Sequence, residues 1–245
     1  MIKSMKKKYI IAAVFVLILF TALIYVFQRE EPMPEAIKAM LPDDKISITV
    51  ERDFIVFQSR TIKTETALII YPGARVDPRA YAPIARAFAE KGVRTILTKM
   101  PLNLAILDYN KADKIIARYD IKNWYIAGHS LGGVMAARYA KKNQDVIDGL
   151  ILWASYPEKS SDLSDSTMPV MSIYGTNDGL TQPGDISDNR HLLPETVQWI
   201  SIKGANHSQF GWYGFQKGDE PADISREEQQ KEIVESTMEL IKSNN

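Results

Sequence analysis

From Ala67 onward the sequence alternates short apolar runs with segments of helical periodicity, and this alternation constrains the fold more than any other feature. The first run, Ala67–Tyr71, is continuously apolar and is closed by Pro72-Gly73, as expected of a strand buried on both faces. A helical pattern follows over residues 81–91 and ends at Gly92. Chains that repeat this order form a parallel sheet covered by helices. We therefore predict an α/β fold with a doubly wound, mostly parallel sheet.

The same patterns predict about eight strands. The first two form an antiparallel hairpin, because Ile46–Val50 alternates apolar and polar residues and a second run begins at Phe54. The other strands are expected at residues 67–71, 95–98, 124–127, 150–153, 170–174 and 197–202. Helices are expected at residues 81–91, 111–119, 131–142 and 186–193, with a last one to residue 242 that begins at the capping box Ser225-x-x-Glu228. Sites in such sheets lie at the carboxyl ends of the strands.

A candidate nucleophile lies at one such strand end. Gly128-His-Ser-Leu-Gly132 separates the strand that ends at Ala127 from the helix that begins at Leu131, and it matches G-x-S-x-G in strand–turn–helix context. Gly128 and Gly132 remove side chains that would clash in so sharp a turn. The amino end of the helix favours developing negative charge. We predict that Ser130 is the nucleophile; the alternative is a merely structural glycine-rich turn.

A serine nucleophile needs a base, and the sequence offers only three histidines. His207 follows the strand that ends at Ile202, so it lies at a strand carboxyl end. His129 is next to the serine and is expected to pack, whereas His191 is expected to be solvated on a surface helix. His207 is therefore the predicted general base.

The base must be oriented by an acid. Asp178 directly follows the strand that ends at Tyr174, in Gly175-Thr-Asn-Asp-Gly179. Position favours it over the rival carboxylates Asp162, Asp165, Asp185 and Asp188. The predicted triad thus has the chain order Ser130, Asp178, His207, which is neither that of chymotrypsin nor that of subtilisin.

The N-terminal region has a different character. Tyr9–Phe27 is a run of 19 residues without a charge, which is about the length that crosses a bilayer as a helix. We predict one transmembrane helix at residues 9–27; a cleaved signal peptide or a buried core helix are the alternatives. Four lysines in residues 1–8 then place this head in the cytoplasm and the body outside the cell membrane. Residues 28–44 are expected to form a proline-rich, acidic spacer before a domain at residues 45–245.

Composition excludes several function classes. The 30 Lys and Arg balance the 30 Asp and Glu, but residues 1–29 hold five of the cations and no acid, so the body is mildly acidic. An acidic body without a basic cluster argues against nucleic acid as a partner. The chain has no cysteine, which excludes a thiolate nucleophile and Cys-ligated metals. No HExxH, P-loop or GxGxxG motif is present, so no metal or nucleotide cofactor is implied.

Taken together, residues 45–242 resemble the α/β-hydrolase superfamily, in particular small lid-less members similar to dienelactone hydrolases and simple esterases. The resemblance is carried by Gly128–Gly133, Gly175–Asp178, Gly204–His207 and the turn Tyr71–Ala74, in which Pro72 stands where the family often has histidine. It implies an α/β-hydrolase fold and acyl transfer to water through a Ser-His-Asp triad. It also implies that the backbone N–H groups of Ala74 and Leu131 form the oxyanion hole.

The expected substrate is a small or surface-presented acyl compound, because only 16 residues separate Trp153 from Val170, too few for a lid domain. Phe210, Trp212 and Tyr213 are either walls of an acyl pocket or ordinary packing. Two other functions stay open at this point. One is a non-catalytic, anchored binding domain on the same fold. The other is a serine peptidase or amidase.

Overall fold

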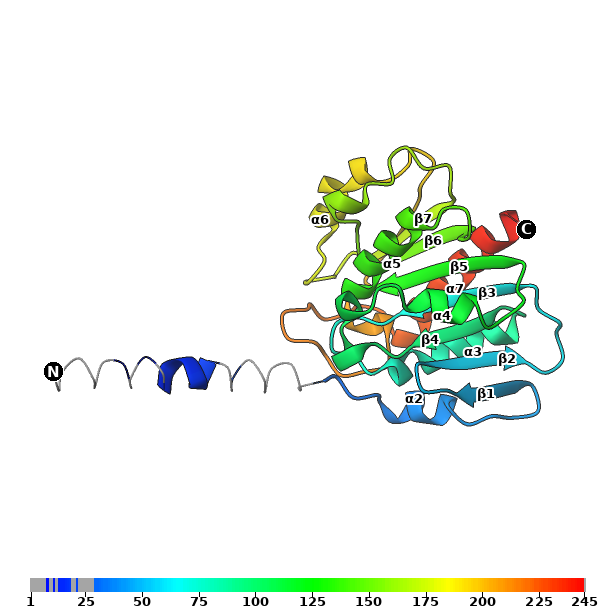
Figure 1. The fold of residues 1–245 in the computed structure, drawn as a ribbon, viewed down its shortest axis with the longest axis horizontal. Coiled ribbons are helices and arrows are strands. Elements are labelled where there is room, and N and C mark those ends of the chain that lie inside the picture. Colours follow the sequence, from blue (N-terminus) through cyan, green and yellow to red (C-terminus); the bar gives the residue numbers. More distant parts are fainter. Residues whose placement is uncertain (1–7, 9–10, 12, 19–20, 22–28, 245) are drawn as a thin grey trace.

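The computed structural model describes residues 8, 11, 13–18, 21 and 29–244. Its body is built on one eight-stranded sheet with the order β1-β2-β4-β3-β5-β6-β7-β8 (Figure 1). The strands are β1 (Ile46–Val50), β2 (Phe54–Ser59), β3 (Thr66–Tyr71), β4 (Arg94–Thr98), β5 (Asn123–His129), β6 (Gly149–Trp153), β7 (Val170–Gly175) and β8 (Gln198–Ile202). β2 pairs antiparallel with β1 and β4, and all other pairs are parallel. The predicted sheet is confirmed.

The helices agree with the sequence pattern in most places. They are α2 (Pro34–Ala39), α3 (Ala82–Glu90), α4 (Lys111–Ile116), α5 (Leu131–Lys142), α6 (Pro183–Asp188) and α7 (Arg226–Ser243). Short 3-10 turns add η1 (Pro78–Tyr81), η2 (Pro101–Asn103), η3 (Ala105–Leu107), η4 (Lys159–Ser161), η5 (Arg190–Leu192) and η6 (Ser208–Phe210). The predicted capping box of α7 is present, with Ser225 and Glu228 bonded to each other's backbone N–H groups.

The predicted helix over residues 186–193 is wrong in its bounds. The structure has α6 and η5 there instead, because Pro183 is preorganised for the first turn and Gln182 with Asp185 forms a capping box upstream. The predicted helix at 111–119 ends at Ile116.

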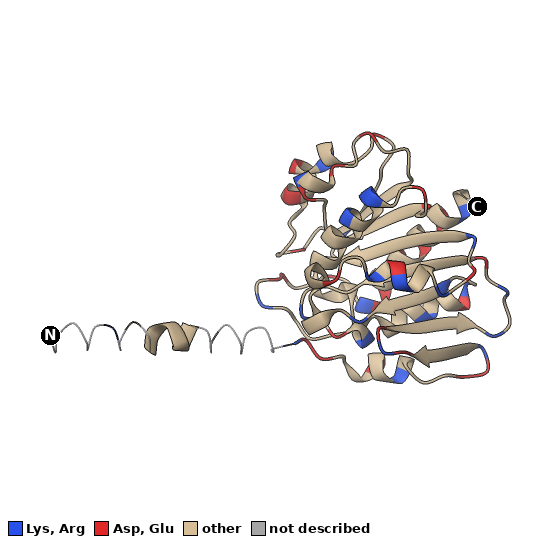
Figure 2. Cartoon of the chain, in the orientation of Figure 1, with Lys and Arg blue, Asp and Glu red and all other residues tan. Residues whose placement is uncertain are grey.

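Helices cover both faces of the sheet. α3 and α7 pack on one face through residues such as Phe88 and Ile233, and α4 and α5 pack on the other through residues such as Ile115 and Met135. In Figure 1, α4 and α5 lie in front of the sheet and the other two lie behind it. Lysines, arginines and acids are interspersed along the helices and loops, while the strands are largely without them (Figure 2). The sheet is therefore a two-sided apolar core, as its continuous apolar runs predict.

Residues 30–43, which belong to the predicted spacer, lie against the body; we call this segment the strap. Glu30 forms a parallel bridge with Val76, and Pro32 forms an antiparallel bridge with Tyr213. The Arg86 guanidinium donates to the Asp43 carboxylate at 2.8 Å. This differs from a free spacer, because the backbone of the strap pairs with the loops that follow β3 and η6.

No helix within the described part of the chain is long and apolar enough to cross a membrane. Residues 1–7 of the predicted cytoplasmic head (residues 1–8) and most of the predicted anchor (residues 9–27) lie outside the described residues. The anchor therefore stays a prediction.

We predict that two truncations differ in stability. Removal of residues 1–28 leaves the urea midpoint unchanged, whereas removal of residues 1–44 lowers the free energy of unfolding by about 3 kcal/mol. The second truncation deletes backbone hydrogen bonds of Glu30 and Met33 that are worth about 1 kcal/mol each. It also removes Ala36, which is fully buried. Equal urea midpoints for the two truncated proteins would contradict this role of the strap.

Candidate active site

The turn between β5 and α5 holds Ser130 in a strained conformation. Its φ of 53° and ψ of −125° lie outside the regions that a non-glycine residue normally adopts. The turn also lies very close to its surroundings: a Cβ on Gly132 would lie 2.2 Å from the Tyr71 carbonyl oxygen, and one on Gly128 would lie 2.4 Å from the Gly132 backbone. Both glycines predicted from the motif are thus required by packing, and the serine is displayed at the start of a helix.

Asp178 and His207 are brought together from the ends of β7 and β8. The His207 Nδ1 atom lies 2.8 Å from Oδ2 of Asp178, and both side chains are almost fully buried. The carboxylate also accepts backbone N–H bonds from Leu180 at 2.9 Å and Thr181 at 2.6 Å. Because the carboxylate is an acceptor, Nδ1 carries the proton of this bond, and Nε2 is the nitrogen left to act as a base.

Ser130 is linked to this pair by the adjacent residue His129, which packs against His207. The ring centroid of His129 is 4.5 Å from that of His207. In the described part of the chain, no hydrogen bond joins the Ser130 hydroxyl to His207, so the serine–histidine contact of the triad stays a prediction. Such contacts often tighten only when substrate binds.

His129, for which the sequence predicts a packing role, belongs to a buried polar chain. The Tyr81 hydroxyl accepts the N–H of Gly73 at 3.0 Å, so its own proton is directed at Nδ1 of His129, 2.8 Å away. Burial, with a contribution from His207, holds the pKa of His129 well below its usual range, so the ring is neutral near pH 7. Burial also raises the pKa of Tyr81. Through its hydrogen bonds to Gly73 and His129, Tyr81 fixes the turn that precedes Ala74.

The two amides expected to form the oxyanion hole are unengaged. Among the described residues, none accepts a hydrogen bond from the backbone N–H of Ala74 or of Leu131. Ala74 lies in the turn after β3, where the next residue, Arg75, donates its backbone N–H to the Asn103 carbonyl at 2.7 Å. Leu131 is the first residue of α5, whose N–H has no partner within the helix. Both N–H groups are therefore available to an incoming acceptor.

Asp219 is the residue that sequence reasoning missed most clearly. Its buried carboxylate accepts the backbone N–H of Gly179 at 3.1 Å and that of His207 at 3.2 Å. It also accepts the N–H and the hydroxyl of Ser208, at 2.7 and 2.6 Å. One side chain therefore ties the loop of the candidate acid to the loop of the candidate base. It lies in a polar loop without any periodic pattern, so no sequence signal identifies it.

The rival groups have other roles. Asp185 caps α6, and Asp162 accepts the backbone N–H of Ser164. Phe210 and Tyr213 are fully buried members of the hydrophobic core, and Trp212 is nearly buried.

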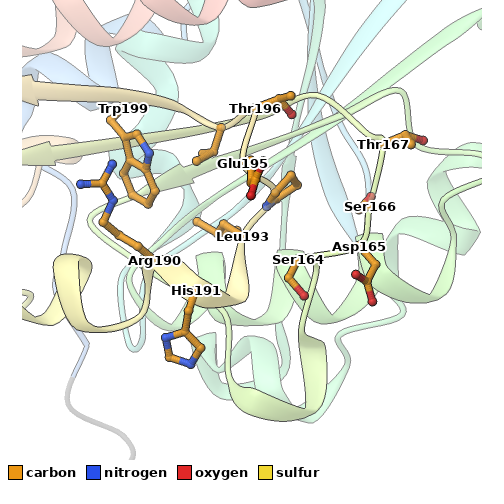
Figure 3. A pocket seen from close by; sticks show the side chains of 12 residues that line it. Ser164, Asp165, Ser166, Thr167, Arg190, His191, Leu193, Glu195, Thr196 and Trp199 are labelled. Atoms are coloured by element: carbon orange, nitrogen blue, oxygen red, sulfur yellow. The ribbon is translucent and has the colours of Figure 1, made fainter.

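A pocket of about 850 Å³ lies at the opposite edge of the sheet, between the loops that lead into β7 and β8 (Figure 3). It includes His191, which is exposed, and Arg190, whose guanidinium lies 4.5 Å from the centroid of the Trp199 ring. None of its lining residues belongs to the candidate site. Within the described residues, no group of three or more His, Asp or Glu side chains is arranged to hold a metal ion.

Comparison with known proteins gives a family and a fold. Residues 67–231 match the Alpha/beta hydrolase family. No curated protein matches the chain significantly in sequence. The structure is similar to Est1E from Butyrivibrio proteoclasticus, with 15% identity and a TM-score of 0.58 over 80% of this chain and 99% of that one.

Two further solved structures share the fold. The thermophilic esterase Est2 from the Planctomycetes species Thermogutta terrifontis has 13% identity and a TM-score of 0.55, over 80% of this chain and 92% of that one. The carboxylesterase CesB from Bacillus subtilis has 9% identity and a TM-score of 0.53, over 71% and 88%. Identities this low show the fold alone.

We predict that Asp219→Asn lowers the free energy of unfolding by about 2–3 kcal/mol, because an amide NH2 then faces N–H donors that had a charged acceptor. The measurement is urea unfolding. The matched control is Asp223→Asn, whose carboxylate accepts from Asn177 at the surface and whose replacement should cost less than about 1 kcal/mol. Equal losses for the two variants would show that Asp219 is not the tie between the two loops.

Proposed function

The chain belongs to the alpha/beta hydrolase family, and from this premise we propose that it is a serine hydrolase that cleaves a carboxylic ester or related acyl bond. The observation that carries the proposal is the buried hydrogen bond between Asp178 and His207, next to the strained turn that presents Ser130. No cofactor or metal enters this chemistry.

The proposed reaction has two halves. In the first, Nε2 of His207 takes the Ser130 proton while Oγ attacks the carbonyl carbon, and His207 then returns the proton to the departing alcohol as the acyl-enzyme forms. In the second, His207 takes a proton from water, whose oxygen attacks the acyl-enzyme, and the carboxylic acid leaves as the proton returns to Ser130. Asp178 keeps the Nδ1 proton in place throughout, so that Nε2 always faces the reaction.

The negative charge that develops on the carbonyl oxygen would be held by the N–H groups of Ala74 and Leu131. Each such donor is worth about 3–4 kcal/mol of barrier in well-studied hydrolases. The Tyr81 hydroxyl supports this arrangement indirectly, because its bond to Gly73 fixes the residue before Ala74.

Two observations favour an esterase over the other functions left open by the sequence. The Thermogutta terrifontis and Bacillus subtilis proteins of the same fold are named an esterase and a carboxylesterase. The conformation of Ser130 argues against a purely binding domain, because its φ of 53° with ψ of −125° costs roughly 1–3 kcal/mol and such strain clusters at active sites.

We predict that a fluorophosphonate probe labels the purified protein and that Ser130→Ala abolishes labelling. Hydrolysis of a short p-nitrophenyl ester should fall by roughly 10⁴-fold or more in the same variant. The control is Ser164→Ala, at an exposed serine away from the candidate site, and this variant should be labelled fully. If the wild-type protein is not labelled and hydrolyses no short acyl ester, the proposed serine hydrolase activity is refuted.

We also propose that residues 9–27 anchor the protein in the cell membrane, with residues 1–8 cytoplasmic and the catalytic domain outside. The support is the uncharged 19-residue run and the four lysines before it. The substrate is then a small or surface-presented acyl compound that reaches the domain outside the cytoplasm.

The expected result is that the intact chain stays with the membrane fraction in high salt, whereas a chain that begins at Arg29 is released. Protease added to intact cells, or to spheroplasts if an outer membrane is present, should degrade the body. Recovery of the intact chain in the soluble fraction, or a body that survives the protease, would disprove the assigned topology.

A further inference from the structure

The strap joins the body at the loop that carries the candidate oxyanion hole. The Glu30 N–H donates to the Arg75 carbonyl at 2.8 Å, and the Asp77 N–H donates to the Glu30 carbonyl at 3.0 Å. In Figure 1, the described chain enters the body on the same side as the orange loop between η6 and α7. Glu30 therefore lies beside the residues that immediately follow Ala74.

Very little chain separates this point from the apolar run. The run ends at Phe27, so only Gln28 and Arg29 lie between it and Glu30. Three residue steps of fully extended backbone span at most about 11 Å. An anchor in residues 9–27 would thus hold the oxyanion loop within about that distance of the membrane surface.

Exposed apolar side chains gather at the same edge. β1 and β4 are both antiparallel to β2, so the carboxyl end of β1 lies at the same edge as those of β3 to β8. Between residues 29 and 244 the structure has nine exposed large apolar side chains. Three of them lie elsewhere, and six lie at or after these strand ends: Val50, Leu102, Ile106, Leu107, Leu180 and Phe215.

Val50 is 61% exposed at the end of β1, and further exposed residues lie on both flanks of Ser130 in the strand order. Ile106 and Leu107, in η3 after β4, are 51% and 53% exposed, and Phe215, after β8, is 60% exposed. Leu102 is also exposed, although its φ of 52° is unfavourable for leucine. The next residue, Asn103, accepts the Arg75 N–H at 2.7 Å, so this apolar segment is fixed to the oxyanion loop. The bias of exposed apolar side chains towards this one edge is the asymmetry expected of a contact surface.

We propose that the carboxyl edge of the sheet docks on the lipid bilayer, with Ile106, Leu107 and Phe215 in contact with lipid, and that the substrate is an acyl ester presented by the membrane. This inference rests on the anchor and the hydrolase activity proposed above. A short connection to an anchor keeps the edge at a high effective concentration at the surface, so weak apolar contacts suffice to orient it. A protein partner or a second copy of the chain would be the other occupants of this edge.

The first test measures lipid contact without catalysis. Because the chain has no cysteine, Leu107→Cys, Phe215→Cys and Ile62→Cys each give one labelling site for an environment-sensitive fluorophore. Ile62 is the matched control, since it is 44% exposed in the loop between β2 and β3, at the other edge. The labelled full-length proteins are reconstituted in phosphatidylcholine vesicles with and without brominated phosphatidylcholine.

We expect brominated lipid to quench the labels at 107 and 215 severalfold more than the label at 62. Equal quenching at the three positions would overturn the proposal. Labels at 107 and 215 that are shielded from aqueous iodide but not quenched by the lipid would also overturn it, because a protein would then cover the edge.

The second test concerns the substrate. The triple variant Ile106→Ser, Leu107→Ser, Phe215→Ser is compared with the control Leu41→Ser, Ile62→Ser on a soluble p-nitrophenyl ester and on a long-chain acyl ester embedded in vesicles. We expect the triple variant to lose about tenfold on the embedded ester and less than twofold on the soluble one, since three apolar contacts with lipid are removed. Equal losses on both esters would overturn the membrane-presented substrate. If the wild-type protein hydrolysed neither ester, the proposed serine hydrolase activity would be refuted. The quenching experiment would still decide whether this edge contacts lipid.

Discussion

The rest of the site depends on the close backbone contact at the β5–α5 turn. α5 begins against the end of β3 because Gly132 has no side chain to hold it off the Tyr71 carbonyl. A Cβ on Gly133 would lie 2.5 Å from the Cβ of Ser155, so the same turn of the helix is held equally close to the segment after β6. With the helix so placed, Ser130 is forced to a positive φ, and His129 is directed into the core against His207. A single added methyl group would displace all of these groups.

Charge placement supports that geometry from the other side. Two buried carboxylates, Asp178 and Asp219, organise the loops after β7 and β8 almost entirely through backbone N–H groups, because no Lys or Arg is bonded to either among the described residues. Bonds from backbone N–H groups fix the main chain itself, which a salt bridge to a flexible side chain does not. The position of the His207 ring therefore depends on the backbone of two loops.

Periodicity and strand-end position are the two features through which the sequence predicts the sheet and the candidate triad. Parallel strands buried on both faces read as unbroken apolar runs, and the G-x-S-x-G glycines answer a steric need that any such turn has. Tyr81 and Asp219 could not be predicted, since they act through side-chain contacts with residues distant in the chain. Tyr81 bonds to His129, 48 positions away, and Asp219 bonds to Gly179, 40 positions away. The pairing of the strap is equally hidden, because a proline-rich and acidic composition indicates solubility and carries no signal of backbone pairing.

The bridge between Glu30 and Val76 makes the turn after β3, which holds Ala74, the point at which the strap first pairs with the body. A pull on the N-terminal segment would load the two hydrogen bonds that flank this bridge before it reached any strand of the sheet. A force on a fusion partner, a tag or a surface linkage placed ahead of residue 30 is thus transmitted to the turn that holds Ala74. The shape of the candidate site would therefore depend on any force applied to the chain ahead of residue 30.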